Sequence, residues 1–286
     1  MQQLAPWQIQ FCESWQLPHD YAENVTDALS WFKSAVSDLQ QPICIAISGC
    51  QGSGKSTLSA YFVAYLRAQG FSAETVSLDD FYLSKNQRLE LAGSLHPAFE
   101  TRGVPGTHNV KAAQTVLESF KNRKSLVLPR FDKSTDNPLS EDLWTKVNAP
   151  LDVLIFEGWC LGVPPEPEER LKLPCNQFEM LQDHDASFRS TVNMFLAADY
   201  QSLFSKFDKL IFLNGKSFKH VFKWRAEQEQ KLIAKTGRGL SEQQIEAFIQ
   251  SYQRLTEWGI NQLPQVCDFE LELDAHRKIL NKQRGK

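Results

Sequence analysis

The sequence predicts a three-layer α/β fold, in which helices cover both faces of a mostly parallel central sheet. Short apolar runs of strand length, such as residues 43–47 and 153–156, alternate along the chain with longer segments of helical periodicity. These runs are continuously apolar, which is typical of strands buried on both faces of a parallel sheet. We therefore expect helices on either side of one central sheet.

Length and composition limit the function classes. The 286 residues suit one large domain, or one domain with an appendage. The net charge of -3 offers no basic surplus, which disfavours binding to nucleic acid or an acidic membrane. The six cysteines show no metal-binding spacing and are expected to be reduced, mostly buried thiols. With no signal-peptide pattern and no membrane-spanning apolar run, the chain is expected to be cytoplasmic.

The first segment, residues 1–41, is predicted to be helical. Val25, Leu29, Phe32 and Val36 recur at helical intervals, and Pro42 ends the pattern before the first strand. We expect a helical segment packed on the core domain of residues 42–286. An arm that binds a partner is the alternative.

A phosphate-binding loop follows the first strand. Residues 49–56 match G-x-x-x-x-G-K-[ST], and they lie between the apolar run 43–47 and a helical segment from residue 56. Such a loop surrounds phosphates with backbone N–H groups at a helix N-terminus. Lys55 is expected to reach the β and γ phosphates and Ser56 to ligate Mg²⁺, whereas a simple glycine turn needs neither residue. The predicted nucleotide-binding residues are Gly49, Cys50, Gln51, Gly52, Ser53, Gly54, Lys55, Ser56 and Thr57.

Acidic residues follow two further predicted strands. Asp79 and Asp80 come after the strand 72–78, and Glu157 ends the strand 151–158. Ligands of open α/β sheets collect at the carboxyl ends of the strands, so these acids are expected beside the bound phosphates, with Glu157 near Mg²⁺. The alternatives are a solvated turn or helix cap for Asp79 and Asp80, and a capping role for Glu157.

The stretch 85–109 lacks clear periodicity and is rich in Gly, Pro, His and Arg, which predicts a long functional loop that includes Arg102. His96 and His108 lack a third metal ligand at a sensible spacing and are interpreted as hydrogen-bonding loop residues. After a helix at 110–122 and a short strand at 125–129, the charged run 130–134 either grips an anionic substrate or forms a surface ion-pair turn.

The remaining chain completes the expected fold. Residues 162–185 form a surface insertion, 193–207 an amphipathic helix and 209–213 a strand. A cationic helix at 218–234, a basic turn and a helix at 241–258 suggest a lid over a triphosphate at about 216–240, or else a solvated charged helix. Residues 268–273 are predicted to be an edge strand, and the basic tail 278–286 to be frayed.

Several motifs together resemble the D-glycerate 3-kinase family of plants and fungi, within the uridine kinase and phosphoribulokinase branch of P-loop kinases. Besides the phosphate loop, the resemblance rests on the segments 77–82 (SLDDFY), 102–108 (RGVPGTH), 128–134 (LPRFDKS), 156–159 (FEGW) and 224–229 (WRAEQE). It extends from about Pro42 to the end of the chain. Val104 and Asn109 stand where Gly or Pro and an Asp are expected, so no acid is available at position 109.

The resemblance implies a three-layer P-loop NTPase fold with a helical lid and an enzyme that uses ATP and Mg²⁺. Ser56, Asp79 and Glu157 are the implied metal site, and Asp79 is also the implied base for the acceptor hydroxyl. Lys55 and Arg225 are expected to neutralise the transferring phosphoryl group. The predicted substrate-binding residues are Asp80, Tyr82, Arg102, Thr107, His108, Arg130, Asp132 and Lys133.

The predicted reaction is phosphorylation of D-glycerate to 3-phosphoglycerate by a monomer or homodimer. Two alternatives stay open from the sequence. One is a kinase for another hydroxylated metabolite, such as a nucleoside or pantothenate. The other is an ATPase that needs no acceptor, although no trans-acting arginine motif or repeat indicates a ring assembly.

Overall fold

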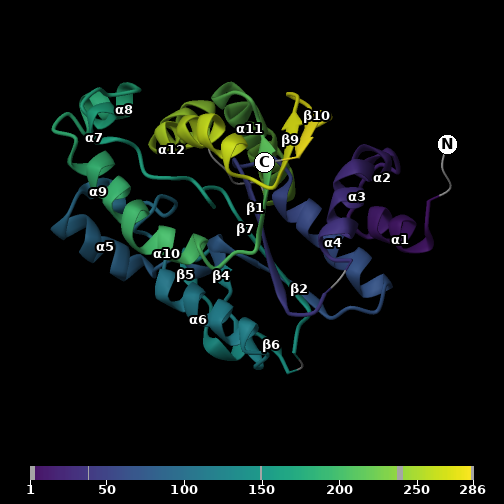
Figure 1. The fold of residues 1–286 in the computed structure, drawn as a ribbon. Helices are drawn as coiled ribbons and strands as arrows, with labels where there is room; N and C mark the ends of the chain where they lie inside the picture. Colours follow the sequence, from purple (N-terminus) through teal and green to yellow (C-terminus); the bar gives the residue numbers. More distant parts are fainter. Residues whose placement is uncertain (1–3, 38, 149, 237–240, 285–286) are drawn as a thin grey trace.

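A six-stranded sheet forms the centre of the protein, and the confirmed architecture is a three-layer α/β fold (Figure 1). The computed structural model describes residues 4–37, 39–148, 150–236 and 241–284. The strand order is β10-β9-β8-β1-β7-β2, with β10 antiparallel to β9 and the other neighbours parallel. The strands are β1 (Ile43–Gly49), β2 (Ala73–Ser77), β7 (Val153–Gly158), β8 (Lys209–Asn214), β9 (Phe269–Leu273) and β10 (Ile279–Arg284).

Two small antiparallel pairs lie outside the central sheet. In one, β3 (Leu126–Leu128) pairs with β6 (Thr145–Val147), and in the other β4 (Phe131–Asp132) pairs with β5 (Asn137–Pro138). The predicted short strand at 125–129 therefore exists, but it does not extend the main sheet.

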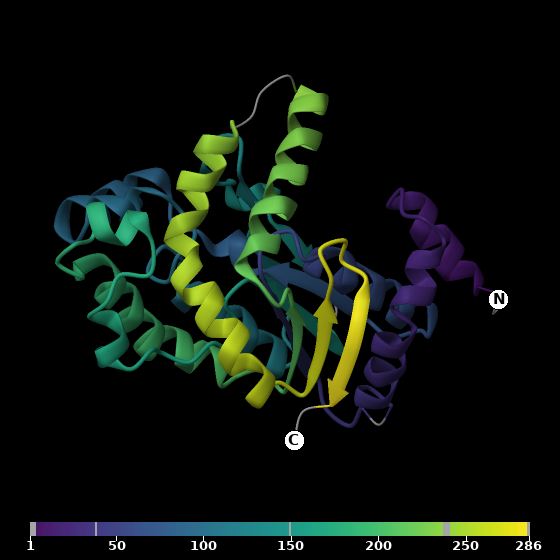
Figure 2. The same cartoon turned by 90° about the horizontal axis from the view of Figure 1, so that it is seen from above.

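Helices cover both faces of the sheet. One face carries α1 (Pro6–Ser14), α2 (Asp20–Asn24), α3 (Thr26–Ala35), α4 (Lys55–Ala68) and the start of α11 (Phe218–Thr236). The other carries α6 (Val110–Lys121), α10 (Gln201–Phe204) and α12 (Glu242–Gln262). Figure 2 shows that the distal ends of α11 and α12 project beyond the body of the molecule.

Shorter elements connect these layers. The remaining helices are α5 (Lys85–Ser94), α7 (Glu168–Leu171), α8 (Gln177–Leu181) and α9 (Ser187–Phe195). The turns of 3₁₀ helix are η1 (Leu78–Phe81), η2 (Pro97–Glu100), η3 (Glu141–Leu143) and η5 (Leu263–Gln265), and η4 (Leu196–Tyr200) is a π-helical turn.

The central strands send alternate side chains into two hydrophobic cores. Cys44 and Ala46 of β1 contribute to the core on one face, and Ile45 and Ile47 to the core on the other. Both sets are fully buried, because a strand's side chains alternate across a sheet that is covered on both sides. This burial explains the continuous apolar runs of the sequence.

The N-terminal helices pack on α4, the helix that follows the phosphate loop. The Gln8 side-chain amide donates a hydrogen bond to the Tyr61 hydroxyl at 2.6 Å, and the rings of Phe32 and Phe62 stack with centroids 4.0 Å apart. The rings of Trp31 and Phe269 stack at 5.0 Å, which joins α3 to β9 as well. Any movement of α4 is therefore coupled to this segment.

The expectation of a long irregular loop at 85–109 is wrong, because α5 occupies its first ten residues. Ser84 caps the helix by accepting a hydrogen bond from the Gln87 backbone N–H, and the Gln87 side chain accepts one from the Ser84 N–H. The only fully buried α5 residue is Arg88, whose guanidinium pairs with Asp136 at 2.6 Å. A helix held by a charge rather than an apolar stripe gives no hydrophobic periodicity.

The C-terminal predictions also need correction. The tail predicted as frayed forms β10, and the strand at 268–273 is therefore not at the edge of the sheet. The helix expected at 193–207 begins at Ser187 and is interrupted by the π-helical turn η4. The insertion 162–185 is not purely a surface excursion, since it buries Glu166, Glu179 and Asp183. All six cysteines are free thiols, and only Cys175 is exposed.

Candidate active site

The phosphate loop joins the end of β1 to the start of α4. Gly52 and Gly54 have φ angles of 77° and 96°, in the left-handed region that favours glycine. A Cβ atom on Gly52 would lie 2.6 Å from the Cβ of Trp224 in α11, so only glycine fits there. The Lys55 ammonium donates to the Cys50 carbonyl at 3.3 Å, which keeps it over the loop.

Strand register brings Glu157 to the phosphate loop. In the sheet, Glu157 is paired with Ile47 of β1 on one side and with Ser77 of β2 on the other. The hydroxyl of Ser56, in the first turn of α4, donates a hydrogen bond to Glu157 Oε1 at 2.9 Å. Asp79 lies two residues beyond Ser77, in η1, so both acids lie at the same carboxyl edge.

Asp79 is held between a cation and a phenol. The Lys133 ammonium donates to Asp79 Oδ2 at 2.6 Å, and the Tyr82 hydroxyl donates to Oδ1 at 3.0 Å. Burial alone raises the pKa of Asp79, but the charge and hydrogen bond of Lys133 outweigh it, with help from His108 and Lys55, and the pKa is lowered. Asp79 is therefore a carboxylate at neutral pH and able to accept a proton.

His108 packs against Tyr82, the phenol that binds Asp79. Its ring stacks on Tyr82 with centroids 4.4 Å apart, and its Nδ1 lies 2.6 Å from the Tyr200 hydroxyl. Burial lowers the pKa of His108 to about 3, so the ring is neutral at physiological pH. Its Nε2 has no hydrogen-bond partner among the described residues. His108 thus orients Tyr82, which in turn contacts Asp79.

Asp80 points toward a different partner. The Arg130 guanidinium donates to Asp80 Oδ2 at 2.9 Å and, through Nε, to the Thr145 hydroxyl at 3.1 Å. Burial raises the pKa of Asp80 despite the opposing charge of Arg130. Arg130 and Lys133 therefore hold the two neighbouring acids separately.

Other predicted substrate-binding residues have structural partners. Arg102 pairs with Asp136, the residue that also binds Arg88. Thr107 is buried and hydrogen-bonded to the backbone of its own loop, at Gly103 and Val104. Asp132 accepts hydrogen bonds from Ser134 and Thr135 in the turn after β4.

The predicted lid, residues 216–240, begins with the first turns of α11, which are packed against the core. In α11, Val221 and Trp224 are fully buried against the core, and Trp224 packs on the phosphate loop. Arg225 pairs with Glu229 at 2.6 Å and lies 5.7 Å above the Phe248 ring of α12. Residues 237–240 of the predicted lid lie outside the described residues.

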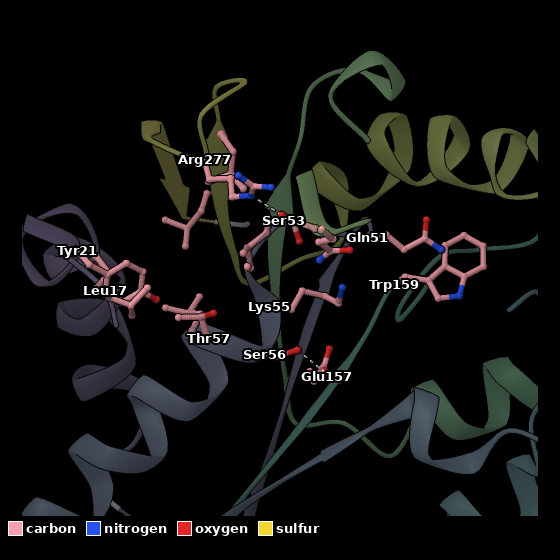
Figure 3. Close-up of a pocket in the computed structure, with 18 of the residues that line it drawn as sticks. Leu17, Tyr21, Gln51, Ser53, Lys55, Ser56, Thr57, Glu157, Trp159 and Arg277 are labelled. Atoms are coloured by element: carbon pink, nitrogen blue, oxygen red, sulfur yellow. Dashed lines mark hydrogen bonds between the residues drawn. The ribbon is translucent and has the colours of Figure 1, made fainter. Parts of the chain in front are cut away.

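One cavity of about 1120 Å³ joins these parts (Figure 3). Lys55, Ser56 and Glu157 lie near its middle, Trp159 lies toward one end, and Leu17 and Tyr21 lie at the other. Asp79, Asp80, Tyr82, Phe131 and Lys133 also line it. The cavity is therefore lined by the phosphate loop, by the carboxylates of Asp79, Asp80 and Glu157, and by the ammonium groups of Lys55 and Lys133.

Sequence reasoning missed Arg277, in the turn between β9 and β10. Its Nε donates to the Gly52 carbonyl at 2.6 Å and its guanidinium pairs with Glu227 at 2.7 Å. The guanidinium also lies 5.3 Å above the Trp224 ring. Arg277 stands between the predicted strand 268–273 and the predicted basic tail 278–286, where no role was assigned. A strand prediction for residues 279–284 is the one signal that would have pointed to a turn here.

Among the described residues, no cluster of three or more His, Cys, Asp or Glu side chains forms a ready metal cage. Within the same part of the chain, no helix is both long and apolar enough to cross a membrane. The cytoplasmic location stays a prediction.

Comparisons with known proteins identify similar kinases. An uncharacterized kinase of Schizosaccharomyces pombe, mug58, is 34% identical over 221 residues, covering 74% of this chain and 79% of the relative. The chloroplastic D-glycerate 3-kinase of Arabidopsis thaliana is 28% identical over 221 residues, covering 74% of this chain and 46% of the relative.

Among solved structures, a D-glycerate 3-kinase from Cryptococcus neoformans has a similar fold. Its TM-score is 0.72 at 24% identity, with 93% of this chain and 98% of that chain covered. No family model matches the sequence.

Proposed function

Because the chain belongs to the D-glycerate 3-kinase family of P-loop kinases, it is an ATP-dependent phosphotransferase, and we propose that it converts D-glycerate to 3-phosphoglycerate. One observation carries the choice of acceptor. Beside the phosphate loop, the Asp79 carboxylate is bound to the Lys133 ammonium at 2.6 Å. A base next to a cation suits a small acceptor that has both a hydroxyl and a carboxylate.

The phosphate loop supplies the ATP phosphate site. The loop's backbone N–H groups and the N-terminus of α4 provide hydrogen-bond donors and partial positive charge. The buried Ser53 hydroxyl has no hydrogen-bond partner among the described residues, which supports a ligand at this position. The Lys55 ammonium, which donates to the Cys50 carbonyl of the same loop, needs only a change of side-chain rotamer to contact the β and γ phosphates.

The oxygen atoms of Ser56, Glu157 and Asp79 fit a Mg²⁺ ion. The first two are already in contact at 2.9 Å, and all three residues line the cavity. Mg²⁺ prefers oxygen ligands, and it usually takes only a few of them from the protein because waters and substrate phosphates complete its coordination. When bound there, the ion neutralises charge on the β and γ phosphates.

In the proposed reaction, the primary hydroxyl of D-glycerate gives its proton to the Asp79 carboxylate. The hydroxyl oxygen forms a bond to the γ-phosphorus, and the bond between that phosphorus and the bridging oxygen breaks, so that ADP leaves. Lys133 moves from Asp79 to the carboxylate of the acceptor, which frees Asp79 as a base. Arg225 joins the site only after leaving Glu229, as part of a closure of α11 and α12.

The test is a coupled ADP-release assay on purified protein with D-glycerate, L-glycerate, glycerol, uridine and pantothenate as acceptors. We expect D-glycerate to give by far the highest kcat/KM. Glycerol is the matched control for the carboxylate, because it retains the hydroxyls and lacks the anion. A preference for uridine or pantothenate would replace the acceptor, and ADP release that ignores every acceptor would indicate a simple ATPase.

A further inference from the structure

The cavity extends past the phosphate loop to the N-terminal segment. At that end it is lined by Leu17, Pro18, Asp20, Tyr21, Glu23, Asn24 and Val25. The facing wall comes from β9, the β9–β10 turn and the first residue of β10, and it includes Leu271, Leu273, His276, Arg277, Lys278 and Ile279. Thr57 of α4 also lines the cavity, and in Figure 3 it lies between Leu17 and Lys55.

The direction in which a triphosphate must lie determines which end of the cavity is left for the nucleoside. Its γ-phosphate must face Asp79, because the acceptor hydroxyl is activated there. The α-phosphate and the nucleoside then extend away from Asp79, past Thr57. In Figure 3, Leu17 and Tyr21 lie beyond Thr57, on the opposite side of Lys55 from Trp159. The N-terminal end is therefore the one available to the nucleoside.

The two walls are fixed to each other and to the phosphate loop. The Asn24 side chain accepts a hydrogen bond from the Ile279 backbone N–H at 3.2 Å, across a separation of 255 residues. Tyr21 packs edge-on against Tyr61 of α4, with ring centroids 5.6 Å apart. Arg277 closes the opposite side through its bond to Gly52. The space between them is thus built from three segments that are held in place.

The chemistry of this end suits a nucleoside. Leu17, Tyr21 and Leu273 provide apolar surface for a planar base, while Asp20 and Glu23 are exposed carboxylates at the rim. Carboxylates accept hydrogen bonds from ribose hydroxyls or from an exocyclic amine. Given the proposed use of ATP at this site, on which the assignment rests, the geometry points to residues 17–25 as one wall of the nucleoside subsite.

The test compares ATP with tripolyphosphate, which has the phosphates and lacks the nucleoside. In Leu17→Trp the larger ring fills the nucleoside end. By titration calorimetry with Mg²⁺ present, the Kd for ATP should rise at least about tenfold, while the Kd for tripolyphosphate should stay within about twofold. The matched control is Ile9→Trp on α1, whose side chain is 38% exposed and does not line the cavity; it should change neither Kd.

Hydrogen exchange on the unmodified protein gives a second measurement that does not depend on a variant folding. ATP should slow amide exchange in residues 17–25, and tripolyphosphate should not. Unchanged ATP affinity in Leu17→Trp, equal weakening of both ligands, or no ATP-specific protection would each overturn the assignment.

Neither measurement contains D-glycerate. A wrong acceptor therefore leaves both results intact, whereas a wild-type protein that fails to bind ATP would contradict the proposed function together with the subsite.

Discussion

Replacing Asp79 by asparagine tests the proposed base without changing the size of the side chain. The amide oxygen of the variant side chain can still accept the hydrogen bond from Tyr82, but it cannot accept a proton from the acceptor. Loss of a positioned general base usually costs about 10²- to 10⁴-fold in rate, or about 3–5 kcal/mol of barrier. The stability cost should stay under about 1 kcal/mol, because the Lys133 side chain is 59% exposed and such ion pairs contribute little.

The assay is ADP release at saturating D-glycerate, with ATP affinity and the urea unfolding midpoint measured on the same preparation. We expect kcat to fall by at least about 100-fold, with the Kd for ATP within about threefold of wild type. Asp185→Asn is the matched control, since Asp185 accepts hydrogen bonds from Ser187 at the start of α9 and does not line the cavity; its kcat should change less than about threefold. An Asp79→Asn enzyme with wild-type turnover would remove Asp79 from the mechanism.

Three further predictions follow from other contacts. Lys133→Met should raise the KM for D-glycerate about tenfold or more and leave the KM for ATP nearly unchanged; equal changes in the two KM values would contradict a contact with the acceptor carboxylate. Because Lys133 lowers the pKa of Asp79, the variant should also lose activity at a higher pH than wild type when the solution is acidified. Burial lowers the pKa of His108 from 6.5 to about 3, so its stabilising contribution is present above pH 6.5 and is lost as the pH falls. Between about pH 6.5 and 4.5, wild type should lose about 2 kcal/mol more unfolding free energy than His108→Gln in urea titrations, and parallel losses would show that His108 takes up its proton in the folded state. Gly103→Ala should destabilise the fold by about 2 kcal/mol or more in the same titrations. The φ angle of Gly103 is +142°, and a Cβ atom there would lie 1.9 Å from the Tyr252 hydroxyl oxygen. An unfolding midpoint equal to that of wild type would mean that this contact relaxes freely.

Local signals made the centre of the site predictable. The phosphate loop is one continuous motif, and Asp79 and Glu157 each follow an apolar strand, so the parallel sheet alone brings them together. The same reasoning placed the main strands and the helices α4, α6, α11 and α12 to within a few residues, and the fold class is confirmed.

The parts that sequence reasoning missed depend on contacts between distant residues. Arg277 reaches Gly52 across 225 residues, and no local pattern distinguishes it from the cations that follow it in the sequence. Arg102 stays a predicted ligand for a substrate anion, but nothing in the sequence indicated that Asp136 pairs with it. Pairings of this kind become visible only when the fold brings the two segments together.

The hydrogen bond between Asn24 and Ile279 joins two segments that are translated 255 residues apart. One wall of the cavity is made with residues 17–25 and the other with residues 271–279, so the pocket stays open on one side until translation has passed residue 279. A nascent chain stalled before β9 should therefore be retained poorly on ATP-agarose, even with its glycine-rich loop already made, and efficient retention would show that the late segment is dispensable.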